Sequence, residues 1–166
     1  MPVKAKFEQA LALHEQGNLP DAERIYREVL QQQPDHFEAW HLLGTIALQA
    51  GHMEQALELF GKAIVLRPDF TDAYCNRGIV LKTLNHPAEA LASYDKAIAL
   101  EPGFAEAHCN RGVVLKILKR PMEALASYDQ ALALKPDFAV AYVNRSNALV
   151  DLNRPAEALA ATGRSR

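Results

Sequence analysis

The sequence is poor in the features that define several protein classes. Its 166 residues include only two cysteines and three methionines, and no apolar run approaches the roughly eighteen uncharged residues that cross a bilayer. The N-terminal residues carry charge throughout and lack the apolar segment of a secretory signal. We therefore expect neither a disulfide framework nor a membrane protein, but a cytoplasmic chain with reduced thiols.

A surplus of charge of one sign is also missing. The chain has 18 lysines and arginines against 20 aspartates and glutamates, so its formal net charge is −2. This balance argues against nucleic acid or an anionic membrane as the main partner. The hydrophobic share of 49% is nevertheless large enough to bury a core.

No residue arrangement typical of catalysis is present either. The sequence contains no glycine-rich phosphate loop and no serine, histidine and aspartate set tied to a turn, and its six histidines are scattered. Cys75 and Cys109 lie 34 residues apart, which is not a metal-ligand spacing. We therefore expect no enzyme activity, no cofactor and no metal.

What the sequence does contain is a period of 34 residues. Prolines, alanines and aromatic residues recur at this spacing, namely Pro34, Pro68, Pro102 and Pro136; Ala22, Ala56, Ala90, Ala124 and Ala158; and Tyr26, Phe60, Tyr94 and Tyr128. The phase divides one predicted domain, residues 1–166, into repeats 3–36, 37–70, 71–104, 105–138 and an incomplete 139–166. Repeats three and four are identical at 22 of 34 positions. Such a period predicts supersecondary units that stack on one another.

Each repeat predicts two antiparallel helices joined by a tight turn. In repeat two, Trp40, Leu43 and Ala47 follow helical spacing, and the second apolar stripe ends before Pro68 because proline cannot continue a helix. Gly51, between the stripes, suits a left-handed backbone. The equivalent residues are Gly17, Asn85, Lys119 and Asn153, of which the lysine is the poor fit.

Small residues occupy the eighth position of each repeat: Ala10, Gly44, Gly78, Gly112 and Ser146. Helices that cross closely need small side chains at the contact. We expect the aromatic residues Phe60, Tyr94 and Tyr128 of the second helices to fill the space beside them.

This pattern resembles the tetratricopeptide repeat family. That family has a bulky residue at position 4, a small one at 8, alanine at 20 and 27, an aromatic at 24 and proline at 32, and the match runs over residues 3–162. The resemblance implies an all-α, right-handed superhelix of antiparallel helix pairs whose first helices line a concave groove. It also implies a scaffold that binds a protein or peptide partner in that groove.

A narrower resemblance rests on asparagine at position 6 of repeats three to five, which is Asn76, Asn110 and Asn144. This row is similar to that in the repeat domains of O-linked N-acetylglucosamine transferases. The resemblance implies that the asparagines hold the main chain of an extended polypeptide, because a primary amide offers both a donor and an acceptor. Glu8 and Leu42 replace asparagine in repeats one and two, so the row should fade towards the N-terminus. The alternative is that common ancestry alone keeps asparagine at a solvated position.

Four further residues are predicted to line the same groove. Cys75 and Cys109 occupy position 5 as a lightly apolar wall, while Lys82 and Lys116 at position 12 either meet acidic groups of a ligand or are simply solvated. A metal site that combines His41 with the two cysteines is not expected, because equivalent atoms of adjacent repeats are separated by about two helix layers of ~8–10 Å.

Arginine stands at position 7 of repeats three to five, as Arg77, Arg111 and Arg145. We expect the stems of these side chains to pack and their charged groups to reach outward, with Asp95 or Asp129 as available partners.

The last repeat has only a short second helix, at about residues 155–161. It is expected to leave an exposed apolar edge made of Val140, Val143, Leu149, Leu152 and Leu159. This edge is consistent with a homo-oligomer formed through the C-terminal repeat, with cover by a ligand, or with a longer protein. The main hypothesis is thus an adaptor that binds an extended peptide or a partner helix in the groove. The alternatives are a self-assembling structural module or a detached targeting module of a glycosyltransferase system.

Overall fold

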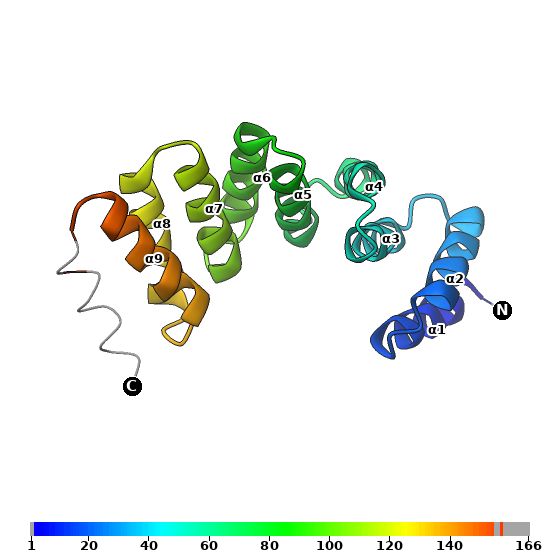
Figure 1. Ribbon diagram of the computed structural model, residues 1–166. Helices are drawn as coiled ribbons and strands as arrows, with labels where there is room; N and C mark the ends of the chain where they lie inside the picture. The colour runs from blue at the N-terminus through cyan, green and yellow to red at the C-terminus, as the bar shows by residue number, and fades with distance from the viewer. Residues whose placement is uncertain (1, 155–156, 158–166) are drawn as a thin grey trace. The chain divides into compact units, whose positions relative to one another are not determined.

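The computed structural model describes residues 2–154 and 157, and this part of the chain folds into nine α-helices without a β-strand (Figure 1). They are α1 (Val3–Glu15), α2 (Leu19–Gln32), α3 (Phe37–Gln49), α4 (Met53–Leu66), α5 (Thr71–Thr83), α6 (Pro87–Leu100), α7 (Ala105–Ile117), α8 (Pro121–Leu134) and α9 (Ala139–Asp151). The helices form antiparallel pairs, so the predicted all-α class is confirmed. Each first helix begins at the first residue of a predicted repeat.

The helices belong to two compact units, residues 1–80 and 81–166, with the division inside α5. In unit one, α3 packs against both α2 and α4, and α1 packs against α2. In unit two, α7 packs against α6 and α8, and α9 contacts both α8 and α7 (Figure 1). Within each unit, therefore, a first helix lies between two second helices, as expected when hairpins stack.

The turn inside each hairpin contains a residue with a positive φ angle. The φ values are 77° at Gly17, 79° at Gly51, 61° at Asn85, 60° at Lys119 and 56° at Asn153. All five are the positions expected from the sequence, so this prediction is confirmed. Lys119 adopts the left-handed region in spite of its Cβ atom, which carries a steric cost of about 1–2 kcal/mol.

The interior of each hairpin is formed by small residues packed against rings. The second helix of each of the first four repeats has a fully buried alanine and a fully buried ring, namely Ala22 and Tyr26, Ala56 and Phe60, Ala90 and Tyr94, and Ala124 and Tyr128. A Cβ atom added to Gly44 would lie 2.7 Å from Cε1 of Phe60, and one added to Gly112 would lie 2.5 Å from Cε1 of Tyr128. Because these distances are too short for two carbon atoms, glycine is what allows the helices to cross so closely. The predicted glycine–ring packing is confirmed in both hairpins.

The apolar edge of α9 differs in part from the expectation. Val140 and Val143 are 58% and 59% exposed, as expected. The expectation for Leu149 is wrong, because this side chain is fully buried and packs against Leu125 of α8. Position 11 faces the second helix of the preceding repeat here, and Leu152 is partly buried in the same cluster. Leu159 and the short second helix expected at about residues 155–161 lie outside the described residues, except for Glu157.

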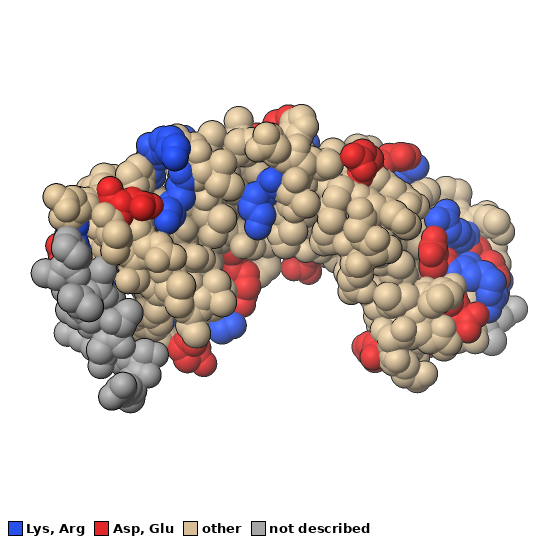
Figure 2. Space-filling model, in the orientation of Figure 1, with Lys and Arg blue, Asp and Glu red and all other residues tan. Residues whose placement is uncertain are grey.

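The first hairpin carries charges of both signs side by side. Lys6 Nζ lies 2.8 Å from a carboxylate oxygen of Glu28, and Arg24 pairs with the same carboxylate at 2.9 Å. Arg27 pairs with Glu23 one turn earlier on α2. Figure 2 shows basic and acidic side chains intermingled over α1 and α2, in agreement with the small net charge of the chain.

Candidate functional site

In unit one, the predicted site residue Asn76 contacts the preceding repeat. Its Nδ2 atom lies 3.0 Å from Nε2 of His41 on α3. The His41 ring packs against the rings of Phe70 and Phe60, with centroid distances of 4.7 and 5.5 Å. Burial lowers the pKa of His41 below its ordinary value of 6.5, although the Asp72 carboxylate acts in the opposite direction. The imidazole is therefore neutral near pH 7, and its Nε2 atom accepts a hydrogen bond that Asn76 donates.

In unit two, Asn144 of α9 makes the equivalent contact with α7. Its Nδ2 atom donates to Sγ of Cys109 at 3.8 Å. Burial raises the pKa of the Cys109 thiol, so the sulfur is uncharged at neutral pH. Asn110 follows Cys109 on α7 and is half-buried, as Asn144 is. We call Asn110, Asn144 and the Cys109 thiol the asparagine face of unit two.

His41 also belongs to the candidate site, although the sequence pattern does not single it out. At position 5 the sequence predicts a lightly apolar groove wall and no metal site, and it does not predict the contact of His41 with Asn76. The available signal was the pairing of a polar residue at position 5 with asparagine at position 6 of the next repeat, 35 residues later. This signal depends on knowing that the first helices of consecutive repeats are neighbours.

The two cysteines are less accessible than residues of an open groove wall. Cys75 and Cys109 are 5% and 3% exposed. Cys109 belongs to a buried cluster that includes Leu115 and Tyr128. Within the described chain neither cysteine forms a disulfide. Cys109 is thus a buried hydrogen-bond acceptor for the Asn144 amide. Direct contact of either thiol with a ligand stays a prediction.

The two lysines of the predicted groove have different surroundings. Lys116 Nζ lies 2.9 Å from Oδ2 of Asp151, which joins α7 to α9. Lys82 of α5 is half-buried and close enough to Cys109 to act against the rise in the pKa of its thiol. A ligand carboxylate at Lys116 would therefore compete with an existing ion pair. Of the predicted site residues, unit two contains Lys82, Cys109, Asn110, Lys116 and Asn144, and unit one contains Cys75 and Asn76.

The position-7 arginines of unit two connect neighbouring hairpins. Arg111 Nε donates to Oδ1 of Asp95 at 2.6 Å, and its Nη1 donates to Oγ of Ser127 at 2.7 Å, so one guanidinium joins α7 to α6 and α8. Arg145 Nε donates to Oδ1 of Asp129 at 2.5 Å. The predicted pairing with Asp95 and Asp129 is confirmed. Because the carboxylates are about half exposed, each ion pair contributes about 1 kcal/mol or less.

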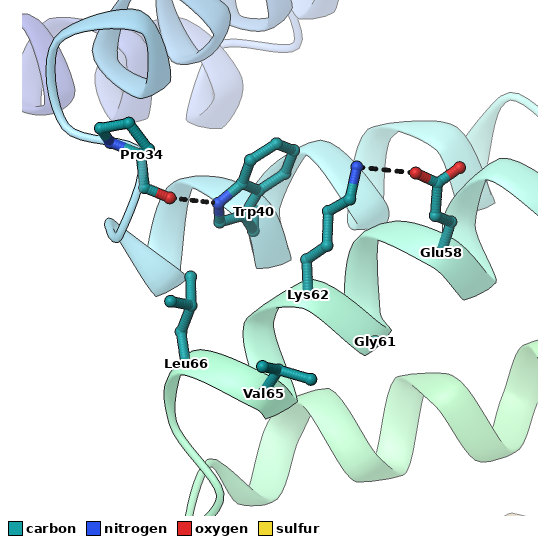
Figure 3. A pocket seen from close by; sticks show the side chains of 7 residues that line it. All are labelled: Pro34, Trp40, Glu58, Gly61, Lys62, Val65 and Leu66. Atoms are coloured by element: carbon teal, nitrogen blue, oxygen red, sulfur yellow. Dashed lines mark hydrogen bonds and ion pairs between the residues drawn. The ribbon is translucent and has the colours of Figure 1, made fainter.

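An apolar cavity of about 480 Å³ in unit one was not predicted from the sequence (Figure 3). It is lined by Pro34, Trp40, Glu58, Gly61, Lys62, Val65 and Leu66. Trp40 Nε1–H donates to the Pro34 carbonyl oxygen at 2.8 Å, and Lys62 Nζ lies 4.6 Å from the centroid of the indole. With Val65 at 80% exposure, the cavity is open and can accept an apolar side chain.

One residue type in the sequence could have indicated this cavity. Gly61 stands where repeats three and four have Asp95 and Asp129. A Cβ atom added to Gly61 would meet no other atom within 4 Å. The missing side chain therefore leaves space along α4, but only the position of the Trp40 ring turns that space into a cavity.

The described residues form neither a metal-binding cluster nor a bilayer-spanning helix. Among residues 2–154 and 157, no three histidine, cysteine, aspartate or glutamate side chains are placed to hold a metal ion. None of the helices in this part of the chain is both long enough and apolar enough to cross a bilayer. The asparagine face is built from amides and a thiol, which bind through hydrogen bonds and packing.

Comparison with known families identifies the repeat. Family models described as tetratricopeptide repeat (TPR) match residues 7–69, 71–104, 105–138 and 139–164. These segments together contain nearly all of the residues that the sequence pattern assigned to repeats.

Similar solved structures extend over almost the whole chain. A crystal structure of MamA protein is 23% identical, has a TM-score of 0.87 and covers 98% of this chain and 89% of its own. MamA, residue 41 to the end, from Desulfovibrio magneticus RS-1 is 18% identical, with a TM-score of 0.90 and coverages of 98% and 92%. YrrB, described as a TPR protein with an unusual peptide-binding site, is 22% identical, with a TM-score of 0.82 and coverages of 96% and 82%. At these identities the similarity shows the fold.

Proposed function

The chain belongs to the tetratricopeptide repeat family, and on that premise we propose that it is a binding scaffold for an extended peptide, held by the asparagines of its first helices. The observation that carries the proposal is the state of the Asn76 and Asn144 amides. Each is half-buried and already uses one N–H in a contact with the preceding repeat. Each amide keeps an oxygen acceptor and a second N–H donor for a ligand.

A main-chain ligand fits these groups better than a side chain does. Every residue of an extended peptide other than proline presents one N–H and one carbonyl group. A row of amides can pair with those groups whatever the side chains of the peptide are. The peptide-binding site described for YrrB, which has the same fold, adds support by similarity. Fold alone does not establish function, so the proposal rests on the asparagines.

The test is to change Asn76, Asn110 and Asn144 to alanine together. Peptides selected from a random displayed library against the intact chain serve as the probe, and isothermal titration calorimetry measures their affinity. Three lost hydrogen bonds of about 0.5–1.5 kcal/mol each predict that affinity falls at least about tenfold. The matched control changes three exposed amides of second helices, Gln31, Gln55 and Gln130, to alanine. Equal affinity of the asparagine variant and the wild type would contradict the proposal.

A second candidate function is self-association through the C-terminal repeat. It is favoured by the exposed valines of α9, of which Val140, Val143 and Val150 are 57–59% exposed. An apolar stripe of this kind is typical of an interface. Light scattering at high concentration should give a mass above that of one chain, and changing Val140 and Val143 to serine should return it to one chain. A wild-type mass of one chain at every concentration would remove this candidate.

The narrower resemblance to the repeat domains of O-linked N-acetylglucosamine transferases stays a prediction from the asparagine row. A targeting module of a glycosyltransferase system would use the same peptide contacts, so it is a special case of the scaffold proposed here. The proposed role involves binding without catalysis. Two buried thiols outside any disulfide in the described chain fit a reducing compartment, and we propose the cytoplasm.

A further inference from the structure

Asn76 and Asn144 make the same kind of contact in two separate places. In each, Nδ2 of an asparagine at position 6 approaches the side chain at position 5 of the preceding repeat, 35 residues earlier. The acceptor is Nε2 of His41 in unit one and Sγ of Cys109 in unit two. Two chemically different acceptors at one structural position indicate that accepting a hydrogen bond is their shared property.

The acceptor determines which end of the amide faces outward. A primary amide has two N–H donors and one carbonyl acceptor, and it can rotate by half a turn to exchange them. A neutral imidazole nitrogen or a thiol sulfur that accepts from Nδ2 selects one of these two orientations. The amide oxygen and one N–H then point away from the acceptor.

We infer that His41 and Cys109 are positioning residues that orient the Asn76 and Asn144 amides, so that each offers its oxygen and one N–H to the main chain of a bound peptide. This inference rests on the proposed function, since the oriented amides act on that same ligand. Fixing an amide before binding removes part of the cost of ordering it in the complex. Neither position-5 residue needs to touch the peptide.

The sequence of repeats one and two agrees with this pairing. Where position 6 is the apolar Leu42, position 5 of the preceding repeat is the apolar Phe7. Where position 6 is Asn76 or Asn144, the preceding position 5 is a residue that can accept a hydrogen bond. Position 5 of one repeat and position 6 of the next are thus both apolar or both polar in these pairs.

The two acceptors differ in how they respond to acid. Protonation of His41 places a hydrogen on Nε2 and converts it from an acceptor to a donor, so the Asn76 amide must turn its oxygen inward. Cys109 stays a neutral thiol over the same range. The titratable groups that act on His41 are Asp72 of α5, which favours its protonation, and His14 of α1, which opposes it.

Two aromatic rings pack against the His41 imidazole. Helix α4 presents the Phe60 ring and the segment before α5 presents the Phe70 ring. Burial holds the pKa of His41 below 6.5. We therefore expect the Asn76 amide to rotate only in acidic solution. The chain therefore contains its own control, because only one of the two asparagines has an acceptor that titrates there.

The experiment follows the side-chain amide signals of Asn76 and Asn144 by ¹H–¹⁵N NMR from about pH 7.5 to about pH 5. Asn76→Ala and Asn144→Ala variants assign the signals. We expect the Asn76 amide protons to shift together with the His41 imidazole signals, and the Asn144 amide protons to stay in place. Protonation of His41 without a change at Asn76, or an equal change at Asn144, would overturn the inference.

Binding measurements supply the second readout. Combining His41→Leu with Cys109→Val removes both acceptors and should weaken the library-selected peptide by roughly three- to tenfold. Combining His41→Gln with Cys109→Ser retains an acceptor at both places and should stay within about twofold of the wild type. Equal affinities of the two double variants would contradict the positioning role.

The two proposals fail in different ways. If the Asn76 amide signals follow His41 as expected but the chain binds no library peptide, the result supports the amide orientation and contradicts the proposed function. Peptide binding that depends on the three asparagines, with Asn76 signals indifferent to His41, supports the proposed function and overturns the inference.

Discussion

Repeats two and four have the same hairpin interior. In both, a glycine at position 8 of the first helix meets a ring at position 24 of the second, as Gly44 with Phe60 and as Gly112 with Tyr128. The approach is so close that a Cβ atom would overlap the ring in either hairpin. The backbone geometry of the pair therefore determines the residue type, and this contact recurs almost unchanged.

The junctions between hairpins are built differently in the same two repeats. Position 7 is Leu43 in repeat two and is 3% exposed. In repeat four it is Arg111, which bridges Asp95 and Ser127. Position 7 thus connects neighbouring hairpins through an apolar side chain in repeat two and through a charged side chain in repeat four. The comparison teaches that the hairpin interior tolerates little variation, while the junction accepts either apolar or ionic chemistry.

The largest expected effect comes from adding one methyl group to the hairpin interior. Gly112→Ala should lower the free energy of unfolding by about 2 kcal/mol, because overpacking costs about 3 kcal/mol and the higher helix propensity of alanine returns about 1. Gly44→Ala should behave alike. Urea unfolding followed by circular dichroism measures both.

The control for these variants is Gly61→Ala on α4, where the added Cβ atom meets nothing within 4 Å. It should raise the free energy of unfolding by about 0.5–1 kcal/mol, as expected for a helical glycine without close neighbours. If Gly112→Ala were as stable as Gly61→Ala, the two interiors would not be constrained in the way the distances indicate.

A smaller effect is expected at the turn, where repeat two has Gly51 and repeat four has Lys119, with φ angles of 79° and 60°. Lys119→Gly should raise the free energy of unfolding by about 1 kcal/mol, since it removes left-handed strain and loses part of that gain to the entropy of the unfolded chain. Gly51→Lys should lower it by a similar amount. Thermal unfolding of the two reciprocal variants measures the difference, and shifts of the same sign would show that the turns are not equivalent.

The smallest effect is expected at the ring itself. Repeat two has Phe60 where repeat four has Tyr128, whose buried hydroxyl has no hydrogen-bond partner in the described part of the chain. Tyr128→Phe should therefore raise the free energy of unfolding by about 0.5 kcal/mol, because it removes an unsatisfied polar group. Chemical denaturation in parallel with the wild type tests this. A loss of more than about 1 kcal/mol would show that the hydroxyl has a partner after all.

The regular part of the fold could be predicted because it depends on residue type at fixed intervals. Helix starts, the left-handed residue of each turn and the glycine–ring contact all follow from local backbone sterics repeated every 34 residues. Leu149 was misplaced for a related reason. Its burial does not depend on a following repeat, because position 11 already packs against Leu125 of α8.

The candidate site was predicted less completely because its contacts join neighbouring repeats. Asn76 and Asn144 could be selected from their position on the first helix. Their hydrogen bonds to His41 and Cys109 could not, because they depend on how first helices 34 residues apart are placed side by side. The cavity beside Trp40 depends in turn on the absence of a side chain at Gly61 and on one indole orientation, and a period conveys neither.

The guanidinium of Arg111 has a consequence for how unit two opens. Its two bonds reach α6 on one side and α8 on the other, so neither helix can separate from α7 without giving up one of them. Arg145 connects α9 to α8 through its bond to Asp129. Local unfolding of unit two that begins at α9 should therefore open whole helices together rather than single residues. Under the proposed function, the asparagine face of unit two would then be lost in whole segments, with the segments that have not yet opened keeping their geometry.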